Sequence, residues 1–425
     1  MNEQAQSVDQ RFESTPAALS SWSRQDTTWM LGLFGTAIGA GTLFLPINAG
    51  VGGFWPLLIL ALLAFPMTYY AHRGLTRFVL SGRDGTDITD VVEERFGLSA
   101  GALITLLYFL AIFPILLIYS VALTNTVGSF MEHQLHIQPP PRIVLSLVLI
   151  LGLLAIVRCG EQATVKVMSL LVYPFIVALA FLAVFLIPHW SGGILSTASE
   201  MPSGSAFLHT LWLAIPVMVF SFNHSPIISA FAVDQKRRYG DHADERSGQI
   251  LCRAHLLMVA MVMFFVFSCV LTLTPAQLAE AKQQNLSILS YLANHFSNPT
   301  IAFAAPIIAF IAIAKSFLGH YIGASEGLKG LVAKTGKRPG AKALDRVTAA
   351  FMLVICWIVA TLNPSILGMI ESFGGPVIAA ILFLMPMYAI RKVPAMRKYS
   401  GHLSNVFVTV VGLVAISALV YSLMG

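Results

Sequence analysis

Long apolar runs are the feature that most constrains what this sequence can fold into. Stretches of 18 or more mostly apolar residues recur throughout the 425-residue chain. Each is long enough to cross about 30 Å of hydrocarbon as an α-helix. Because 56% of the residues are hydrophobic and only 11% are charged, we expect much of the folded surface to face lipid. The runs lack the alternation of an outer-membrane barrel, so the predicted fold class is an all-α polytopic membrane protein.

The apolar runs predict eleven membrane-spanning helices. Their approximate ranges are 28–51, 54–79, 98–130, 142–159, 163–187, 206–232, 249–274, 299–328, 346–362, 364–390 and 403–424. The preceding segment, 1–27, is polar and lacks the pattern of a removable signal peptide. Cys159, Cys252, Cys269 and Cys356 lie in or beside apolar runs without metal-binding spacing, so we interpret them as buried small residues and predict no metal site.

Lysine and arginine predict the orientation of these spans, because cytoplasmic connections accumulate positive charge. With the N-terminus inside, only Arg142 and Lys282 fall outside and Lys315 falls within the membrane, and the rest of the 26 basic residues lie inside. We therefore expect segment 1–27 to be cytoplasmic and the C-terminus to lie on the opposite side. The net charge of +6 is then an orientation signal, so the lipid bilayer is an expected partner and a nucleic acid is not.

Span one contains residues that interrupt a helix. Its middle reads Gly39-Ala40-Gly41-Thr42, and Pro46 follows. Freed backbone groups are costly in hydrocarbon, so an interruption at this depth needs a reason. Close helix packing is one alternative, since Gly35 and Gly39 form a small-xxx-small pair. We favour unwinding near Gly39 to Gly41.

Span six contains a second interruption, in which polar side chains replace an apolar run. It reads Phe220-Ser221-Phe222-Asn223-His224-Ser225-Pro226. Pro226 suits the first position of a new helix, where its missing N–H is not needed, and Ser225 could cap that helix. Five spans separate the two interruptions, and an odd number of spans inverts the second set in the membrane. Paired broken helices in inverted repeats mark the binding site of many secondary transporters.

This symmetry predicts three parts after the N-terminal segment. A first repeat covers 28–187, a second repeat covers 206–390, and an eleventh helix covers 403–424. A weaker interruption in span ten, at 371–376, could end one half-helix and begin another; Glu371 there is either a gate carboxylate or an interfacial residue. Gly319, Gly323 and Gly327 in span eight are interpreted as packing residues.

Each break exposes free carbonyl groups beside free N–H groups, which together suit an amino acid zwitterion. The N–H groups of Ala40, Gly41 and Thr42 would bind the carboxylate. Carbonyls near 36–38 and 220–222 would bind the ammonium. Nearby hydroxyl and amide side chains favour a small hydroxylated substrate over a large apolar one. Tyr119 in span three could close the pocket. The predicted substrate-binding residues are Ile38, Gly39, Ala40, Gly41, Thr42, Tyr119, Ser221, Asn223, His224 and Ser225.

Lys315 lies about midway through span eight, and an intramembrane lysine is a functional hypothesis by default. Burial disfavours the charged form of an amine, so such a lysine can gain and lose a proton. We predict that Lys315 and Ser316 form the coupling site, with the ammonium bridging to span-one carbonyls. A permanently charged structural lysine and one that reaches toward the cytoplasm are the alternatives. His224 could relay protons or only stabilise the break.

These motifs resemble the hydroxy and aromatic amino acid permease family, in particular its serine transporter branch. The resemblance covers nearly the whole chain. It is carried by WMLGLFGTAIGAGTLFLPINAGVGG from Trp29, AFPMTYYAHRGLTRFVLSG from Ala64, WLAIPVMVFSFNHSPIIS from Trp212, AKSFLGHYIGASEG from Ala314, TLNPSILGMIE from Thr361 and LFLMPMYAIRKVPAMRKYSGH from Leu382.

The resemblance implies a leucine-transporter-like fold with a 5+5 inverted repeat in a bacterial inner membrane, with the C-terminus periplasmic. It implies L-serine import by proton symport. It also implies substrate contacts at Gly39, Ala40, Gly41, Asn223 and Ser225, and coupling at Lys315. A threonine/serine or aromatic amino acid symporter is the alternative, and a channel is a further one. The chain shows no enzyme motif, so we expect neither enzymatic activity nor a cofactor.

Overall fold

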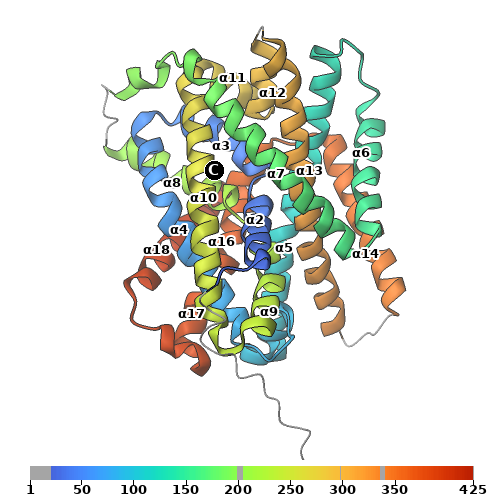
Figure 1. Cartoon of the computed structure of the whole chain (residues 1–425), viewed down its shortest axis with the longest axis vertical. Helices are drawn as coiled ribbons and strands as arrows, with labels where there is room; N and C mark the ends of the chain where they lie inside the picture. Colours follow the sequence, from blue (N-terminus) through green and yellow to red (C-terminus); the bar gives the residue numbers. More distant parts are fainter. Residues whose placement is uncertain (1–20, 199–203, 297, 336–339, 425) are drawn as a thin grey trace, which may run out of the picture.

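Helices make up the regular secondary structure of the computed structural model, which describes residues 21–198, 204–296, 298–335 and 340–424 (Figure 1). Segment 1–27 therefore lies mostly outside the described residues. Eight predicted spans correspond to single helices. These are α4 (Phe54–Leu80), α5 (Ile88–His133), α6 (Arg142–Arg158), α7 (Glu161–Phe185), α10 (Ala243–Thr272), α13 (Pro299–Lys334), α14 (Ala341–Leu362) and α18 (Leu403–Met424).

The other three predicted spans are each built from shorter pieces. Span one is α2 (Arg24–Ala37) followed by α3 (Ala40–Val51). Span six is α8 (Gly204–Ser221), the 3-10 turn η3 (Ser225–Ile227) and α9 (Ile228–Tyr239). Span ten combines α15 (Ile366–Met369), α16 (Gly375–Ala379) and α17 (Met385–Lys392) with the π-helical segments η5 (Ile370–Gly374) and η6 (Ala380–Leu384).

Helix length and apolar composition alone give fewer membrane crossings than the eleven predicted. Among the described residues, seven helical stretches are long and apolar enough to cross a membrane, or eight if the bent pair α2 and α3 is one span. One stretch, Phe207–Thr272, contains both predicted spans six and seven. Helix α6 has only 17 residues, and Leu403–Ala418 of α18 is also short. The chain is a multi-pass membrane protein, and the total of eleven spans stays a prediction.

Span ten differs from its prediction, because its helix continues through the Gly374-Gly375-Pro376 sequence. The residues around it form one π-helical turn, which α16 then follows with Pro376 in its first turn. Proline is tolerated in the first turn of a helix, because the backbone N–H that proline lacks would have no helical acceptor there. The wider π turn accommodates this sequence, so the helix continues without a break.

Local sequence determines several helix ends. Ser23 and Asp26 form a reciprocal capping box that begins α2, with N···O distances of 3.1 and 2.8 Å. Gly97 interrupts α5 with φ 81°, a conformation that favours glycine, and it lies one residue before the predicted start of span three. The buried-cysteine prediction is right for Cys269 and Cys356 but wrong for Cys159, which is exposed at the end of α6.

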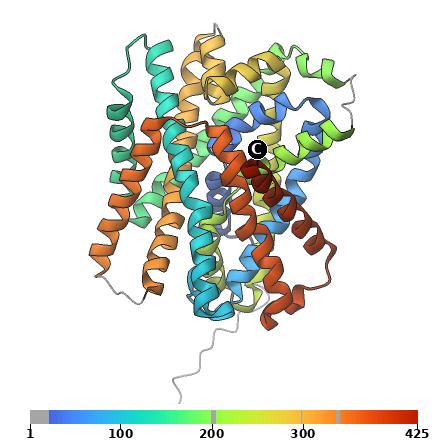
Figure 2. The same ribbon diagram turned by 180° about the vertical axis from the view of Figure 1, so that it is seen from behind.

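The bundle has two chemically different ends. Helices α9 and α17 lie at one end, and α11 (Pro275–Gln283) and α12 (Ile288–His295) cover the other (Figure 1). Figure 2 shows α5 running along the opposite side of the bundle. The basic connections gather at the first end, where Lys236 lies 3.0 Å from Asp84 and Lys334 lies 2.6 Å from Glu93.

Helix α13 is the central element, because it packs against α5, α7, α2 and η3. Its glycines permit these approaches. A Cβ on Gly319 would lie 2.9 Å from Met168, and one on Gly323 would lie 2.8 Å from Pro226. A Cβ on Gly327 would lie 3.2 Å from the Cα of Phe109. The prediction that the three are packing residues is confirmed.

Candidate functional site

The first break lies between α2 and α3. Ile38 is extended, with ψ 99°, and Gly39 has φ −145° and ψ −143°, which is not helical. The two halves meet at an angle of 53°. The predicted unwinding is correct in kind but lies one to two residues earlier, because Ala40 and Gly41 already belong to α3. No side chain caps the N-terminus of α3, so its first N–H groups point into the break.

The second break covers Phe222, Asn223 and His224 between α8 and η3. Ser225 was predicted to cap the next helix, and this is wrong, because Ser225 is the first residue of η3 and no side chain caps that turn. Instead the Asn223 carboxamide oxygen accepts the Ser225 N–H at 3.1 Å. An Asn side chain can form this local turn because it reaches the backbone two residues ahead.

The two breaks contact each other through main-chain and side-chain hydrogen bonds. The Ser221 hydroxyl lies 2.9 Å from the Gly41 carbonyl oxygen and 2.7 Å from the Val217 carbonyl oxygen, and it can donate its one hydrogen to either. The Thr42 hydroxyl donates to the Ser221 carbonyl at 3.3 Å. A Cβ on Gly41 would lie 2.8 Å from the Ser221 Cα, so glycine is what allows the chains to come this close.

Helices α13 and α5 close the first break from the other side. The Ser316 hydroxyl donates to the Ile38 carbonyl at 2.9 Å. The Tyr119 hydroxyl lies 3.0 Å from where a Gly39 Cβ would be, and the Tyr119 ring meets His320 edge-on with centroids 5.0 Å apart. The structure thus brings Ile38, Gly39, Tyr119 and Ser316 together at one point.

Lys315 is fully buried but does not make the predicted bridge to span-one carbonyls. Its Nζ has no hydrogen-bond partner among the described residues and lies 4.2 Å from the centroid of the Phe175 ring in α7. Its stem packs beside Gly35 of α2. Successive residues on a helix point about 100° apart, so Ser316 reaches the break and Lys315 reaches the α2–α7 interface.

Several buried polar atoms around the breaks have no hydrogen-bond partner in the described part of the chain. They are Asn223 Nδ2, His224 Nε2, Lys315 Nζ and His320 Nε2. Three of them belong to residues that had been singled out from the sequence. Because native proteins satisfy nearly all buried polar groups, these four atoms are available to bind a water, an ion or a ligand.

Two buried histidines were missed by sequence reasoning. His72 of α4 and His255 of α10 lie beside His224, and one ring nitrogen of each of the three falls within 4.8 Å of the others. The three are far apart in the sequence, so no spacing rule identifies them. The available signal was that each is an ionisable residue inside an apolar span, the rule that selected Lys315.

Polar networks close the bundle at both ends. At the basic end, Asp26 of α2 accepts the Tyr239 hydroxyl at 2.8 Å and lies 3.8 Å from Arg246 of α10. At the other end, Glu371 accepts the Asn48 amide at 2.8 Å and lies 3.5 Å from Lys282. Glu371 therefore takes part in a network that joins span one to span ten.

Two broken helices whose breaks contact each other inside a bundle are typical of secondary transporter folds. The fold is similar to the crystal structure of MhsT in complex with L-phenylalanine, with TM-score 0.64 and 15% identity over 95% of this chain and 98% of that chain. That protein has the leucine-transporter fold, which confirms the predicted fold class.

Family comparisons cover almost the whole sequence. The tryptophan/tyrosine permease family model matches residues 28–424. The serine transporter SdaC of Escherichia coli (strain K12) is 68% identical over 412 residues, which are 95% of this chain and 96% of that protein. SdaC of Shigella flexneri is 66% identical over the same length. The chain belongs to the tryptophan/tyrosine permease family.

Proposed function

We propose that this protein imports L-serine by proton symport across a bacterial inner membrane. The observation that carries the proposal is the meeting of two helix breaks, where the uncapped N-terminus of α3 contacts Ser221 at the end of α8. The N–H groups of Ala40, Gly41 and Thr42 would hold the carboxylate, and freed carbonyls at the end of α2 would hold the ammonium. The SdaC relatives, named serine transporters, support the choice of substrate.

The side chains around the breaks favour a small polar substrate. Asn223 Nδ2 is buried, has no partner in the part of the chain that the structure describes, and can donate to a substrate hydroxyl. Phe220 and Tyr119 already lie close to Gly41 and Gly39, which leaves little width for a large ring. Ser221 and Thr42 bond to the main chain here, so they would hold the two breaks together or turn toward the substrate during transport.

Proton coupling is assigned to Lys315, with Ser316 next to it in the chain. A buried ammonium without a carboxylate or carbonyl partner is costly, whereas a neutral amine against the Phe175 ring is tolerated. Gaining and losing a proton at Lys315 would therefore change how α2 packs on α7 and α13. Because Ser316 bonds to the Ile38 carbonyl, a shift of α13 at Lys315 is felt directly at the break.

Transport in proteoliposomes tests both the substrate and the ion. Serine accumulation is measured under an imposed pH gradient, with and without sodium, for the parent and for Lys315→Ala. We expect accumulation driven by the pH gradient and lost in the variant. Accumulation that needs sodium would reject proton coupling, and normal accumulation by Lys315→Ala would reject the lysine. Preferential uptake of tryptophan, tyrosine or threonine would reject serine, and conductance without a substrate would indicate a channel.

The orientation is proposed from the distribution of basic residues. Arg77, Lys236 and Lys334 lie at the end of the bundle that carries α9, and this end would face the cytoplasm together with the N-terminus. The C-terminus would be periplasmic. Labelling of single cysteines from either side of intact cells, one at exposed Arg237 and one at exposed Glu132, tests this orientation.

A further inference from the structure

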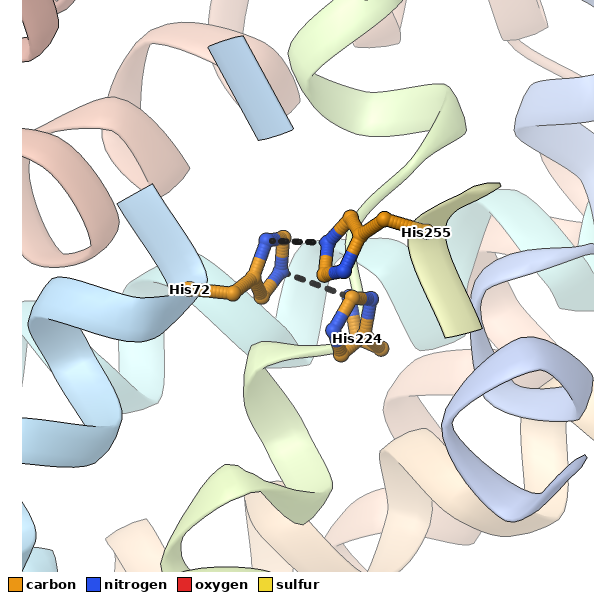
Figure 3. Close-up of side chains that lie close together, drawn as sticks. All are labelled: His72, His224 and His255. Carbon is orange, nitrogen blue, oxygen red and sulfur yellow. Dashed lines mark hydrogen bonds between the residues drawn. The ribbon is translucent and has the colours of Figure 1, made fainter. Parts of the chain in front are cut away.

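Three buried imidazoles face one another at the second break, and they come from α4, from α10 and from the unwound segment itself (Figure 3). The rings of His72 and His224 stack with centroids 3.6 Å apart and planes 8° apart. The ring of His255 lies 5.2 Å from that of His72 and 4.8 Å from that of His224. We propose that these three histidines form a proton-binding site that controls the unwound segment of span six. The inference rests on the proposed proton symport and adds a second protonatable site to Lys315.

Main-chain carbonyls determine which ring nitrogens carry hydrogen when the cluster is neutral. Each Nδ1 lies within hydrogen-bond distance of a carbonyl oxygen. The acceptors are Thr68 for His72 at 2.8 Å, Phe222 for His224 at 3.1 Å and Leu251 for His255 at 2.7 Å. Because a carbonyl can only accept, each Nδ1 is the N–H and each Nε2 keeps its lone pair. The neutral cluster therefore offers three basic nitrogens.

One of these lone pairs supports the break directly. The Nε2 of His72 accepts the main-chain N–H of His224 at 3.2 Å. A proton bound to this Nε2 makes it a donor, so the hydrogen bond to His224 is lost and that N–H must turn away. The same unwound segment carries Asn223, so a proton on His72 changes the position of a predicted substrate contact.

The other two lone pairs can share the proton. The Nε2 of His224 is buried and has no hydrogen-bond partner within the described ranges, and its ring lies face to face with that of His72. An imidazolium is stabilised over the face of a neutral ring. The Nε2 of His255 lies 3.5 Å from His72 Nδ1. When His72 binds a proton at Nε2, it can release its Nδ1 proton to His255, so the proton can be shared by all three rings.

Ionisable groups on the surrounding helices favour a temporary charge over a permanent one. Helix α4 contributes Tyr69, whose ring lies 5.9 Å from that of His255, and Arg73, which donates to the Tyr69 hydroxyl at 3.2 Å. Helix α10 contributes Cys252 beside Tyr69, and α13 contributes His320, which acts electrostatically on His224. None of these groups is a carboxylate that would hold a positive charge in place, and burial disfavours a fixed charge on the cluster, so a bound proton can leave.

A metal ion is the competing occupant, and the ring arrangement argues against it. Zinc bound at 2.0–2.1 Å would need its nitrogens about 3.4 Å apart and the rings directed at one point. Here two rings are stacked face to face, and the Nε2 of His72 is already occupied by a main-chain N–H.

The test separates substrate binding from proton movement. Serine counterflow, which needs no net proton transfer, is compared with serine-driven proton uptake in proteoliposomes for the parent, His72→Gln and His255→Gln. A glutamine oxygen at position 72 can still accept the His224 N–H but does not bind a proton near neutral pH. We expect His72→Gln to keep counterflow within about threefold of the parent while proton uptake per serine falls to about half, because Lys315 still binds its proton. His133→Gln, at an exposed site on α5, is the matched control.

A parent-like proton to serine ratio in both cluster variants would overturn the inference while leaving serine–proton symport intact. If either variant loses counterflow, serine affinity is measured in detergent as a function of pH. We expect serine affinity to depend less on pH in the variants than in the parent. An unchanged pH dependence overturns the inference. One equivalent of bound metal in the parent that is absent from His72→Gln would also overturn it, in favour of a metal site. Absence of serine uptake by the parent would instead reject the proposed function.

Discussion

The buried ion pair at the basic end of the bundle should control how readily α2 swings open. Asp26 of α2 and Arg246 of α10 have side chains only 1% and 2% exposed, with 3.8 Å between their charged atoms. Asp26 also accepts the Tyr239 hydroxyl of α9, so one carboxylate connects three helices. Replacing it by asparagine keeps the shape and one acceptor but removes the charge opposite Arg246.

The expected cost is large because a buried guanidinium loses its counter-charge. Breaking one side of a buried pair typically costs about 3–5 kcal/mol. The amide and the Ser21 carbonyl, which accepts from Arg246 at 3.1 Å, offset part of this, so we take the lower end, about 3 kcal/mol. Since about 1.4 kcal/mol is a factor of ten, Asp26→Asn should shift the equilibrium toward the open form about a hundredfold.

Distances between spin labels at Thr28 of α2 and Glu245 of α10 measure this shift. Both positions are exposed, and the labels are placed after the four native cysteines have been replaced by serine. We expect a longer-distance population in Asp26→Asn and its partial reversal in Asp26→Asn with Arg246→Gln, which removes both charges. Arg237→Gln removes a 75% exposed guanidinium from a surface pair worth about 0–1 kcal/mol and is the control. An unchanged distance distribution in Asp26→Asn would refute the reasoning.

Two further predictions concern the breaks and the opposite end. Gly41→Ala places a Cβ 2.8 Å from the Ser221 Cα, so we expect overpacking of about 1–3 kcal/mol and at least tenfold slower serine transport. Gly32→Ala is the control and should transport normally, because no described atom lies within 4 Å of its Cβ. Equal rates in the two variants would contradict the close approach at Gly41. Glu371→Gln keeps an acceptor for Asn48 and loses a half-exposed ion pair, so initial uptake rates should stay within about fivefold of the parent. Complete loss of uptake would mean that the charge itself is required.

The two helix breaks could be predicted because their causes are local. Glycines that permit non-helical backbone and a proline that lacks an N–H act on their own neighbours, so the residues themselves mark the interruption. The sequence predicted the position of the first break only to within one or two residues, because Ala40 and Gly41 belong to α3 rather than to the unwound segment. The Gly374-Gly375-Pro376 sequence carries the same local signal, yet packing keeps that helix continuous through a π turn.

The partners of buried polar residues could not be predicted, because they depend on helix rotation. Lys315 and Ser316 are neighbours in the sequence, and nothing local decides which of them faces the first break. The histidine cluster shows the same limit more strongly. His72, His224 and His255 come from three different spans, and only the packing of α4 and α10 around the second break brings them together.

Unpaired polar atoms near the breaks explain why substrate and proton should move together. Asn223 Nδ2 and Lys315 Nζ are buried without partners among the residues that the structure describes, and each such group typically costs about 1–3 kcal/mol. Serine bound between the breaks would satisfy the amide, and the substrate carboxylate would favour a nearby cation. A proton bound at Lys315 or among the histidines would in turn favour that carboxylate. Under the proposed symport each ligand would therefore lower the cost of binding the other, and by linkage the coupling would be equal in both directions.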